Sequence, residues 1–300
     1  MKRLNRLVAR VVSWLPESVV WLFSRRYIAG RSLADAVAKT KELNGLGCCV
    51  TMDVLGEDTT RLDDARQAAA ECLRVLEAID GEGLDANLSV KLTALGLKLD
   101  AEQCCRRVER IVERAGRLGN SVRIDMEDAT CTDDTLAIYR RLRKSHANVG
   151  TVIQARLKRS GEDVRRLIEE GIARLRICKG IYDEPADIAH TDRRAIRDSY
   201  MRLVRMMLES RSHVAIATHD GELIRRSAEL IGSIGPPRES FEFQMLLGVG
   251  ERMRARLVEE GRRVRVYVPY GESWHAYSMR RLRECPHVAG HVIKNLLVRR

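Results

Sequence analysis

Residues 86–126 read ANLSVKLTALGLKLDAEQCCRRVERIVERAGRLGNSVRIDM. The two ends of this stretch, 86–92 and 121–126, alternate apolar with polar residues, and that period of two predicts β-strands. The middle part, 101–117, is long enough for a helix and predicts one. A strand, a helix and a second strand in this order form a unit whose two strands lie parallel.

The same alternation of a short strand with a longer helix continues along the chain. Strands are predicted at 48–54, 86–92, 121–126, 149–155, 173–178, 213–219, 240–246 and 264–269. Helices are predicted between them at 60–79, 101–117, 133–145, 161–170, 189–211, 221–232 and 250–260. Eight such units predict an α/β fold, a parallel (β/α)8 barrel of the TIM type.

Helical segments flank the predicted barrel on both sides. They are predicted near 3–13, 17–25, 32–44, 273–284 and about 288–298. No linker-like composition divides the chain. We therefore expect an N-terminal helical segment, 1–44, to pack on a single catalytic barrel of residues 45–300.

The composition is that of a water-soluble globular protein. Hydrophobic residues make up 45% and charged residues 32% of the 300 positions, and no 18-residue apolar stretch occurs, which excludes a polytopic membrane protein. The formal net charge of +11 suits a solvated basic surface, a nucleic acid, an anionic membrane or an anionic small molecule. The eight cysteines contain no Cys-x-x-Cys spacing, which predicts reduced thiols and a cytoplasmic protein.

The N-terminal segment is basic and amphipathic. It lacks the long uncharged region and cleavage site of a signal peptide, so we expect none. Its apolar residues recur at helical spacing, and these residues are Leu4, Leu7, Val8, Val11, Val12 and Leu15. Such a helix either packs on its own domain or lies on the inner face of a membrane.

The positions that should point into the barrel carry polar side chains. The interior of an ordinary barrel is filled by Val, Ile and Leu, and burying charges is costly unless they pair or hold a polar ligand. One interpretation is an internal ion-pair network, formed by Arg123, Arg174, Glu242 and Arg265. The other is a functional site at the C-terminal strand ends, formed by Lys91, Asp125, Gln154, Arg176, Thr218, His219 and Gln244. This second set would suit a large polar cofactor.

Several motifs are absent from the sequence. No Gly-x-Gly-x-x-Gly follows the first strand and no Walker loop occurs, so a Rossmann or P-loop nucleotide site is unsupported. His287 and His291 are spaced i, i+4, but no third ligand is evident, and we expect no metal site. Aromatic residues make up only 4%, so nucleic-acid recognition has little support beyond charge.

Short motifs in a fixed order resemble the proline dehydrogenase family, in particular its single-function bacterial members. They are Arg-Arg-Tyr-Ile-Ala-Gly at 25–30, Asp-Val-Leu-Gly-Glu at 53–57, Ser-Val-Lys-Leu-Thr-Ala-Leu-Gly at 89–96, Ile-Asp-Met-Glu at 124–127, Gln-Ala-Arg-Leu at 154–157, Leu-Arg-Ile-Cys-Lys-Gly-Ile-Tyr at 175–182, Ala-Thr-His-Asp at 217–220, Phe-Glu-Phe-Gln-Met-Leu at 241–246, Tyr-Val-Pro-Tyr-Gly at 267–271 and Tyr-x-x-Arg-Arg-Leu-x-Glu at 277–284.

The resemblance implies a distorted barrel that binds FAD non-covalently at its mouth, with a C-terminal helix nearby. It implies oxidation of L-proline to pyrroline-5-carboxylate by hydride transfer from C5 to flavin N5, with electrons passed on to a membrane quinone. Carried over by motif, Asp125 and Arg176 would be the catalytic pair. Substrate would be bound by Lys91, Arg280, Arg281, Tyr267, Tyr277 and Glu284. The cofactor would be held by Met126, Gln154, Lys179, Gly180, Ile181, Tyr182, Thr218 and His219.

Some positions depart from the pattern of the resemblance. Ile181 stands where the family usually has alanine, and Arg156 where an aromatic residue is common. Trp-His-Ala at 274–276 and Val288 are further departures. A related cyclic imino acid such as hydroxyproline is therefore an alternative substrate. A non-catalytic basic barrel that binds nucleic acid or membrane is an alternative from a different class.

Overall fold

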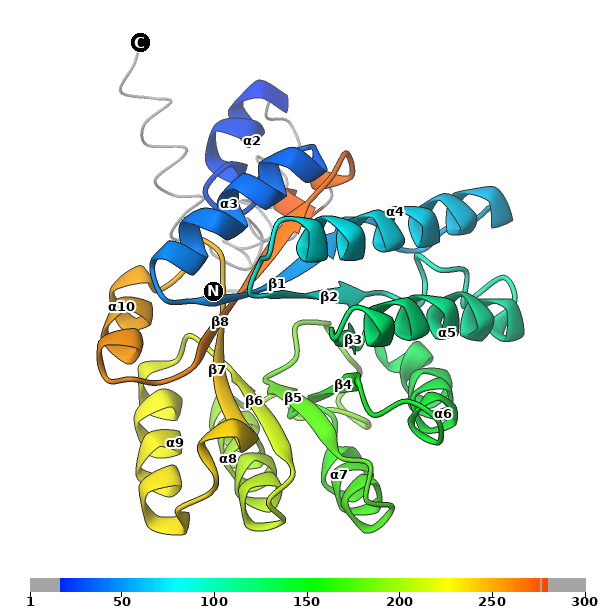
Figure 1. Cartoon of the computed structure of the whole chain (residues 1–300). Helices are drawn as coiled ribbons and strands as arrows, with labels where there is room; N and C mark the ends of the chain where they lie inside the picture. The colour runs from blue at the N-terminus through cyan, green and yellow to red at the C-terminus, as the bar shows by residue number, and fades with distance from the viewer. Residues whose placement is uncertain (1–16, 276, 280–300) are drawn as a thin grey trace.

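The computed structural model describes residues 17–275 and 277–279. In that part of the chain, eight parallel strands close into a barrel in sequence order, with β8 paired to β1 (Figure 1). The strands are β1 (Cys49–Val54), β2 (Ala86–Val90), β3 (Val122–Ile124), β4 (Val149–Gln154), β5 (Arg174–Cys178), β6 (His213–Ala217), β7 (Phe241–Leu246) and β8 (Val264–Tyr270). The predicted fold class and all eight predicted strands are confirmed.

Helices surround the barrel on its outside (Figure 1). The described helices are α2 (Glu17–Ser24), α3 (Leu33–Gly45), α4 (Leu62–Gly81), α5 (Ala101–Arg117), α6 (Thr132–Arg143), α7 (Ser160–Glu169), α8 (Arg193–Glu209), α9 (Gly221–Ile234) and α10 (Glu251–Glu259). Short 3-10 turns lie at Ala129–Cys131 and Arg238–Ser240. Helix α8 begins later than the predicted residue 189, because Asp192 caps it by accepting hydrogen bonds from the backbone N–H groups of Arg194 and Ala195.

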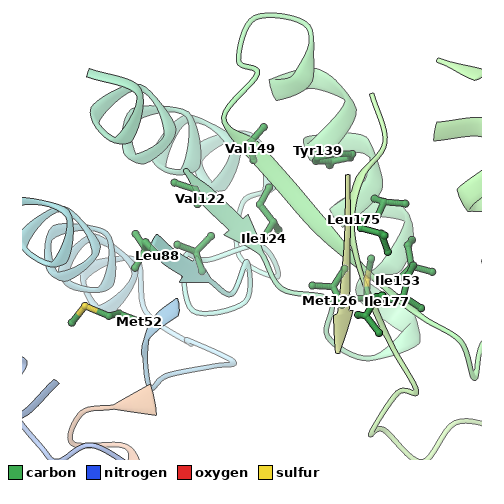
Figure 2. Close-up of a cluster of buried hydrophobic side chains, with 14 of the residues drawn as sticks. Met52, Leu88, Val122, Ile124, Met126, Tyr139, Val149, Ile153, Leu175 and Ile177 are labelled. Carbon is green, nitrogen blue, oxygen red and sulfur yellow. The ribbon is translucent and has the colours of Figure 1, made fainter. Parts of the chain in front are cut away.

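The apolar core lies between the strands and the helices. Outward-facing strand residues such as Leu88, Val122, Ile124, Leu175 and Ile177 are almost completely buried. Figure 2 shows them packed in one cluster beneath the surrounding helices. Alternation along each strand therefore sends one set of side chains into the apolar layer and the other into the barrel.

The barrel interior is held by charge instead of aliphatic packing. Arg265 Nε donates to Glu242 Oε1 at 2.9 Å, and its Nη1 donates to the carbonyl oxygen of Val50 at 2.7 Å. Arg123 Nη1 donates to the carbonyl oxygens of Thr151 and Arg174 at 2.9 and 2.8 Å. The predicted internal ion pair is confirmed for Glu242 and Arg265, whereas Arg123 is satisfied by backbone carbonyl groups.

The N-terminal helices pack against the barrel. Ala36 and Leu43 of α3 belong to the main core. Helix α2 covers the segment after β8, where the rings of Trp21 and Trp274 meet edge to face at 4.8 Å and the Arg31 guanidinium lies 5.0 and 5.2 Å from their centroids. The division of the chain at residue 45 stays a prediction. The predicted helices near 3–13 and 288–298 lie outside the described residues.

We predict that Glu242→Gln destabilises the barrel by about 3–5 kcal/mol at neutral pH, because it leaves Arg265 buried without a counter-charge. Burial favours the protonated acid, but the Arg265 guanidinium outweighs it and lowers the pKa of Glu242 below its ordinary 4.5. This contribution to stability is therefore present above about pH 4.5 and is lost as the pH falls toward the folded-state pKa.

Urea unfolding followed by circular dichroism, at pH 7 and at about pH 3.5, measures the effect. The difference in unfolding free energy between the wild type and Glu242→Gln should shrink at the lower pH. The exposed Glu259→Gln serves as the control. An equal difference at both pH values would contradict the ion-pair explanation.

Candidate active site

A cavity of about 790 Å³ opens at the C-terminal ends of the strands. Its volume is within the range of cofactor and small-molecule sites. Thirteen of the predicted site residues line it, namely Lys91, Asp125, Met126, Gln154, Arg176, Lys179, Gly180, Ile181, Tyr182, Thr218, His219, Tyr267 and Tyr277. The other three, Arg280, Arg281 and Glu284, lie outside the described residues. The fold therefore brings together side chains that are up to 186 positions apart, since Lys91 and Tyr277 meet the same cavity.

Asp125 is the centre of the cavity floor. It follows the short strand β3, and its Oδ1 accepts a hydrogen bond from Arg176 Nη1 at 2.6 Å. Its Oδ2 accepts one from the Tyr267 hydroxyl at 2.7 Å. Burial alone would raise the pKa of Asp125, but the charges of Arg176 and Lys91 outweigh it and hold that pKa below its usual value. Asp125 is thus a buried, permanently ionised carboxylate at neutral pH.

Lys91 lies beside this pair, just after β2. Its Nζ is 2.7 Å from Asp53 Oδ1, 3.3 Å from the Tyr267 hydroxyl and 3.9 Å from Asp125 Oδ2. Burial opposes the charged amine, but the carboxylates of Asp53 and Asp125 outweigh it and raise the pKa of Lys91. The ammonium charge is therefore secure at the cavity wall.

Asp53 is a residue that the sequence-based site prediction missed. It lies on β1 and is 1% exposed. The available signal was one charged residue within an otherwise apolar strand, the segment CCVTMDV at 48–54. Glu127, Arg197 and Asp220 were missed as well. Glu127 and Asp220 each end one of the quoted motifs, whereas Arg197 lies in helix α8 and carries no motif signal.

Arg176 connects the cavity to the barrel interior. Its Nε donates to Gln244 Oε1 at 2.6 Å, and Gln244 Nε2 donates to Glu242 Oε1 at 2.5 Å. Glu242 is the partner of Arg265 described above. The Nη2 atom of Arg176 is buried and has no hydrogen-bond partner in the protein. A buried donor without a partner is costly, so a polar ligand in the cavity would complete this guanidinium.

The wall formed after β4 and β5 has little room for side chains. Gln154 Nε2 donates to the carbonyl oxygen of Glu127 at 2.7 Å. Gly180 has a φ of +93°, and a Cβ there would lie 2.9 Å from Gln154 Oε1. Only glycine fits without strain in this position. Gly180 therefore makes room for Gln154 and Arg156, and it lines the cavity beside them.

Basic side chains gather at the outer part of the cavity. Asp220 Oδ2 lies 3.4 Å from Lys179 Nζ and accepts a hydrogen bond from Arg197 Nε at 2.9 Å. The backbone N–H of Asp220 donates to Thr218 Oγ1, and His219 Nε2 accepts from the backbone N–H of Leu246 at 2.8 Å. Arg197 Nη1 also lies 3.2 Å from Glu222 Oε2. Lys179, Arg193 and Arg197 all line the cavity, and such cations suit the phosphate groups of a ligand.

The loop after β5 forms the rest of this wall. Arg156 Nη1 donates to the carbonyl oxygen of Tyr182 and so holds the loop against β4. Ile181 is 37% exposed and faces the cavity as an apolar side chain. Among the described residues, no cluster of three or more His, Cys, Asp or Glu side chains is arranged to hold a metal ion.

Comparison with known proteins places the chain in a family. A family model described as proline dehydrogenase matches residues 36–293. The chain belongs to the proline dehydrogenase family. Proline dehydrogenase 1 of Bacillus subtilis subsp. natto is 39% identical over 276 residues, which cover 92% of this chain and 91% of that protein. The proline dehydrogenase of Deinococcus radiodurans is 33% identical over 291 residues, or 95% of this chain and 94% of that protein. The predicted membership of the proline dehydrogenase family is confirmed.

Solved structures support the fold independently of sequence identity. The structure of proline utilization A from Bdellovibrio bacteriovorus inactivated by N-propargylglycine matches with a TM-score of 0.82 at 24% identity. The match covers 87% of this chain but only 32% of that longer protein. This likeness shows that the chain has the barrel fold of part of that larger protein.

Proposed function

We propose that this protein oxidises L-proline to pyrroline-5-carboxylate with bound FAD. The observation that carries the proposal is the linked array of Lys91, Tyr267, Asp125 and Arg176 on the cavity floor of a proline dehydrogenase family member. Fixed charges and an aromatic wall around one cavity suit a small zwitterion whose ring must be held in one orientation.

The residues around the cavity fit a flavin dinucleotide. Arg176 offers the unpartnered Nη2, Gly180 lines the cavity, and Lys179 and Arg197 present cations for phosphate. Bound flavin would supply the hydride acceptor, which amino-acid side chains cannot provide. Gln154, Met126, Thr218 and His219 would hold the same cofactor.

The chain's own residues would bind and orient the substrate. Lys91 would attract its carboxylate, together with Arg280 and Arg281, which lie outside the described residues. Tyr267 and Tyr277 would enclose its ring, and Glu284 would pair with the arginines. Asp125 would keep Arg176 and Tyr267 in place as the reaction proceeds, because it accepts a hydrogen bond from each.

We further propose that a membrane quinone accepts the electrons from a cytoplasmic, peripherally bound protein. The support is the amphipathic pattern near residues 3–13, whose basic side suits an anionic membrane surface. None of the described helices is both long and apolar enough to cross a bilayer. No nucleic-acid partner is proposed.

The first prediction from the proposed function concerns the cofactor and the substrate together. The purified protein should be yellow, and its flavin absorbance should bleach on addition of L-proline. Heat release and chromatography of the chromophore should identify FAD. Recovery of FMN, or of no flavin, contradicts the cofactor proposal. Faster bleaching by hydroxyproline than by proline would identify hydroxyproline as the preferred substrate.

The second prediction concerns Asp125 and Arg176. Asp125→Ala and Arg176→Ala should each slow flavin reduction by proline by at least roughly tenfold, about 1.4 kcal/mol of barrier. Each change removes one half of the 2.6 Å ion pair on the cavity floor. Stopped-flow absorbance with a verified flavin content measures the rate. The exposed Asp133→Ala should leave it unchanged, and unaltered rates in the first two variants would remove the pair from the reaction.

The third prediction separates the substrate carboxylate from its ring. Arg281→Met should raise the KM for L-proline by at least about tenfold, since charge-assisted hydrogen bonds contribute about 1.5–3 kcal/mol. Arg280→Met should behave alike, and Lys91→Met should also lower the maximal rate because it misplaces the ring. Pyrrolidine lacks the carboxylate, so its oxidation should change little. An equal loss for both substrates would mean that these residues support the fold or the cofactor.

A further inference from the structure

Asp53 is close to the candidate site but does not reach it. The residue lies near the end of β1, where it is paired in register with Ser89 of β2 and Pro269 of β8. Its side chain is 1% exposed and is absent from the cavity wall, while Lys91 in front of it lines the cavity. Asp53 can therefore act on a ligand only through Lys91.

Lys91 bonds to only one of the two carboxylate oxygens of Asp53. Asp53 Oδ1 accepts a hydrogen bond from Lys91 Nζ at 2.7 Å, whereas Asp53 Oδ2 is buried and has no hydrogen-bond partner in the protein. Burial raises the pKa of Asp53 and the charge of Lys91 opposes that rise, so the ionised form of Asp53 depends on Lys91. Asp53 is in turn the nearer of the two carboxylates beside the Lys91 ammonium, since Asp125 Oδ2 lies 3.9 Å away. The two charges therefore hold each other in the interior.

The geometry also fixes where the ammonium points. One of the three N–H donors of the Lys91 ammonium is bonded to Asp53, on the side away from the cavity. The Tyr267 hydroxyl lies 3.3 Å from Nζ on the cavity side. Because that N–H group is held by Asp53, the other N–H donors of Lys91 face Asp125 and the cavity. A Lys side chain without this anchor has a flexible four-carbon stem and many alternative positions.

We propose that Asp53 is a positioning residue that keeps Lys91 charged and aims its ammonium into the cavity, toward the carboxylate of a cyclic imino acid. The proposal rests on the proposed function only for the identity of that ligand. The charge and orientation of the Lys91 ammonium do not depend on the proposed function. The two can therefore be tested separately.

The chain offers a matched control for this pair. Lys98 Nζ lies 2.7 Å from Asp58 Oδ1, the same separation as between Lys91 and Asp53. The control pair is exposed, with 45% and 62% of its side chains accessible, and lies away from the cavity wall. Exposed pairs contribute little, so Asp58→Asn should be silent where Asp53→Asn is not.

The first experiment measures the protonation state of Lys91 and needs no catalytic turnover. The wild type, Asp53→Asn and Asp58→Asn are treated with acetic anhydride at about pH 8, and modification of each lysine is followed by mass spectrometry. Acetylation of Lys91 should accelerate at least about tenfold in Asp53→Asn, because loss of the carboxylate leaves more of the amine neutral. An unchanged rate at Lys91 overturns the proposal.

The second experiment tests whether Asp53 orients the Lys91 ammonium toward the substrate carboxylate. In Asp53→Asn the KM for L-proline should rise at least about tenfold while the KM for pyrrolidine stays constant, with normal flavin content. Equal effects on both substrates overturn the positioning role. If the wild type does not bleach with proline at all, the proposed function fails, while the acetylation result still decides the state of Lys91.

A double variant covers the case in which Asp53→Asn fails to fold. Asp53→Leu combined with Lys91→Met removes both buried charges, and such replacement is often tolerated where removal of one partner is not. The double variant should regain a thermal transition near that of the wild type and keep the raised KM for proline. If it also fails to fold, Asp53 has a structural role independent of Lys91, and the proposal is overturned.

Discussion

The ion pair between Asp125 and Arg176 joins the ends of β3 and β5 across β4, and the candidate site depends on it. Asp125 follows β3, while Arg176 comes from β5, and only 2.6 Å separates Oδ1 from Nη1. Each partner is buried, so removing either one leaves a buried charge without its nearest counter-charge. The pair also fixes Tyr267 and, through Gln244, continues into the barrel.

The barrel interior is therefore filled by a continuous polar network, where an ordinary barrel has packed aliphatic side chains. Glu242 and Arg265 carry it toward the opposite end, where Arg265 also donates to the backbone of β1. A network in which nearly every donor is satisfied is rigid. The exceptions include Arg176 Nη2, which belongs to a cavity-lining residue, and Asp53 Oδ2, which lies behind Lys91.

Stability and function are consequently divided between the two faces of each strand. The outward faces pack with the helices in an ordinary apolar layer, as Figure 2 shows around Leu88, Ile124 and Ile177. The inward faces are released from that task and can carry charge. Active sites of this fold lie at the C-terminal strand ends, where loops can vary without disturbing the layer beneath.

The sequence by itself determined the barrel, because eight repeats of strand and helix allow few other closed arrangements. It also determined most cavity-lining residues, since strand alternation and motif order identified Lys91, Asp125 and Arg176 as inward-facing residues at strand ends. The sequence predicted the pairing of Glu242 with Arg265, but only the tertiary structure decided that Lys91 pairs with Asp53 and that Arg123 donates to backbone carbonyl groups. Lys91 meets Asp53 across 38 positions and Arg176 meets Asp125 across 51, and such distances depend on barrel closure and strand stagger. Local periodicity carries no information about stagger, so the role of Asp53 appeared only once the strands were placed side by side.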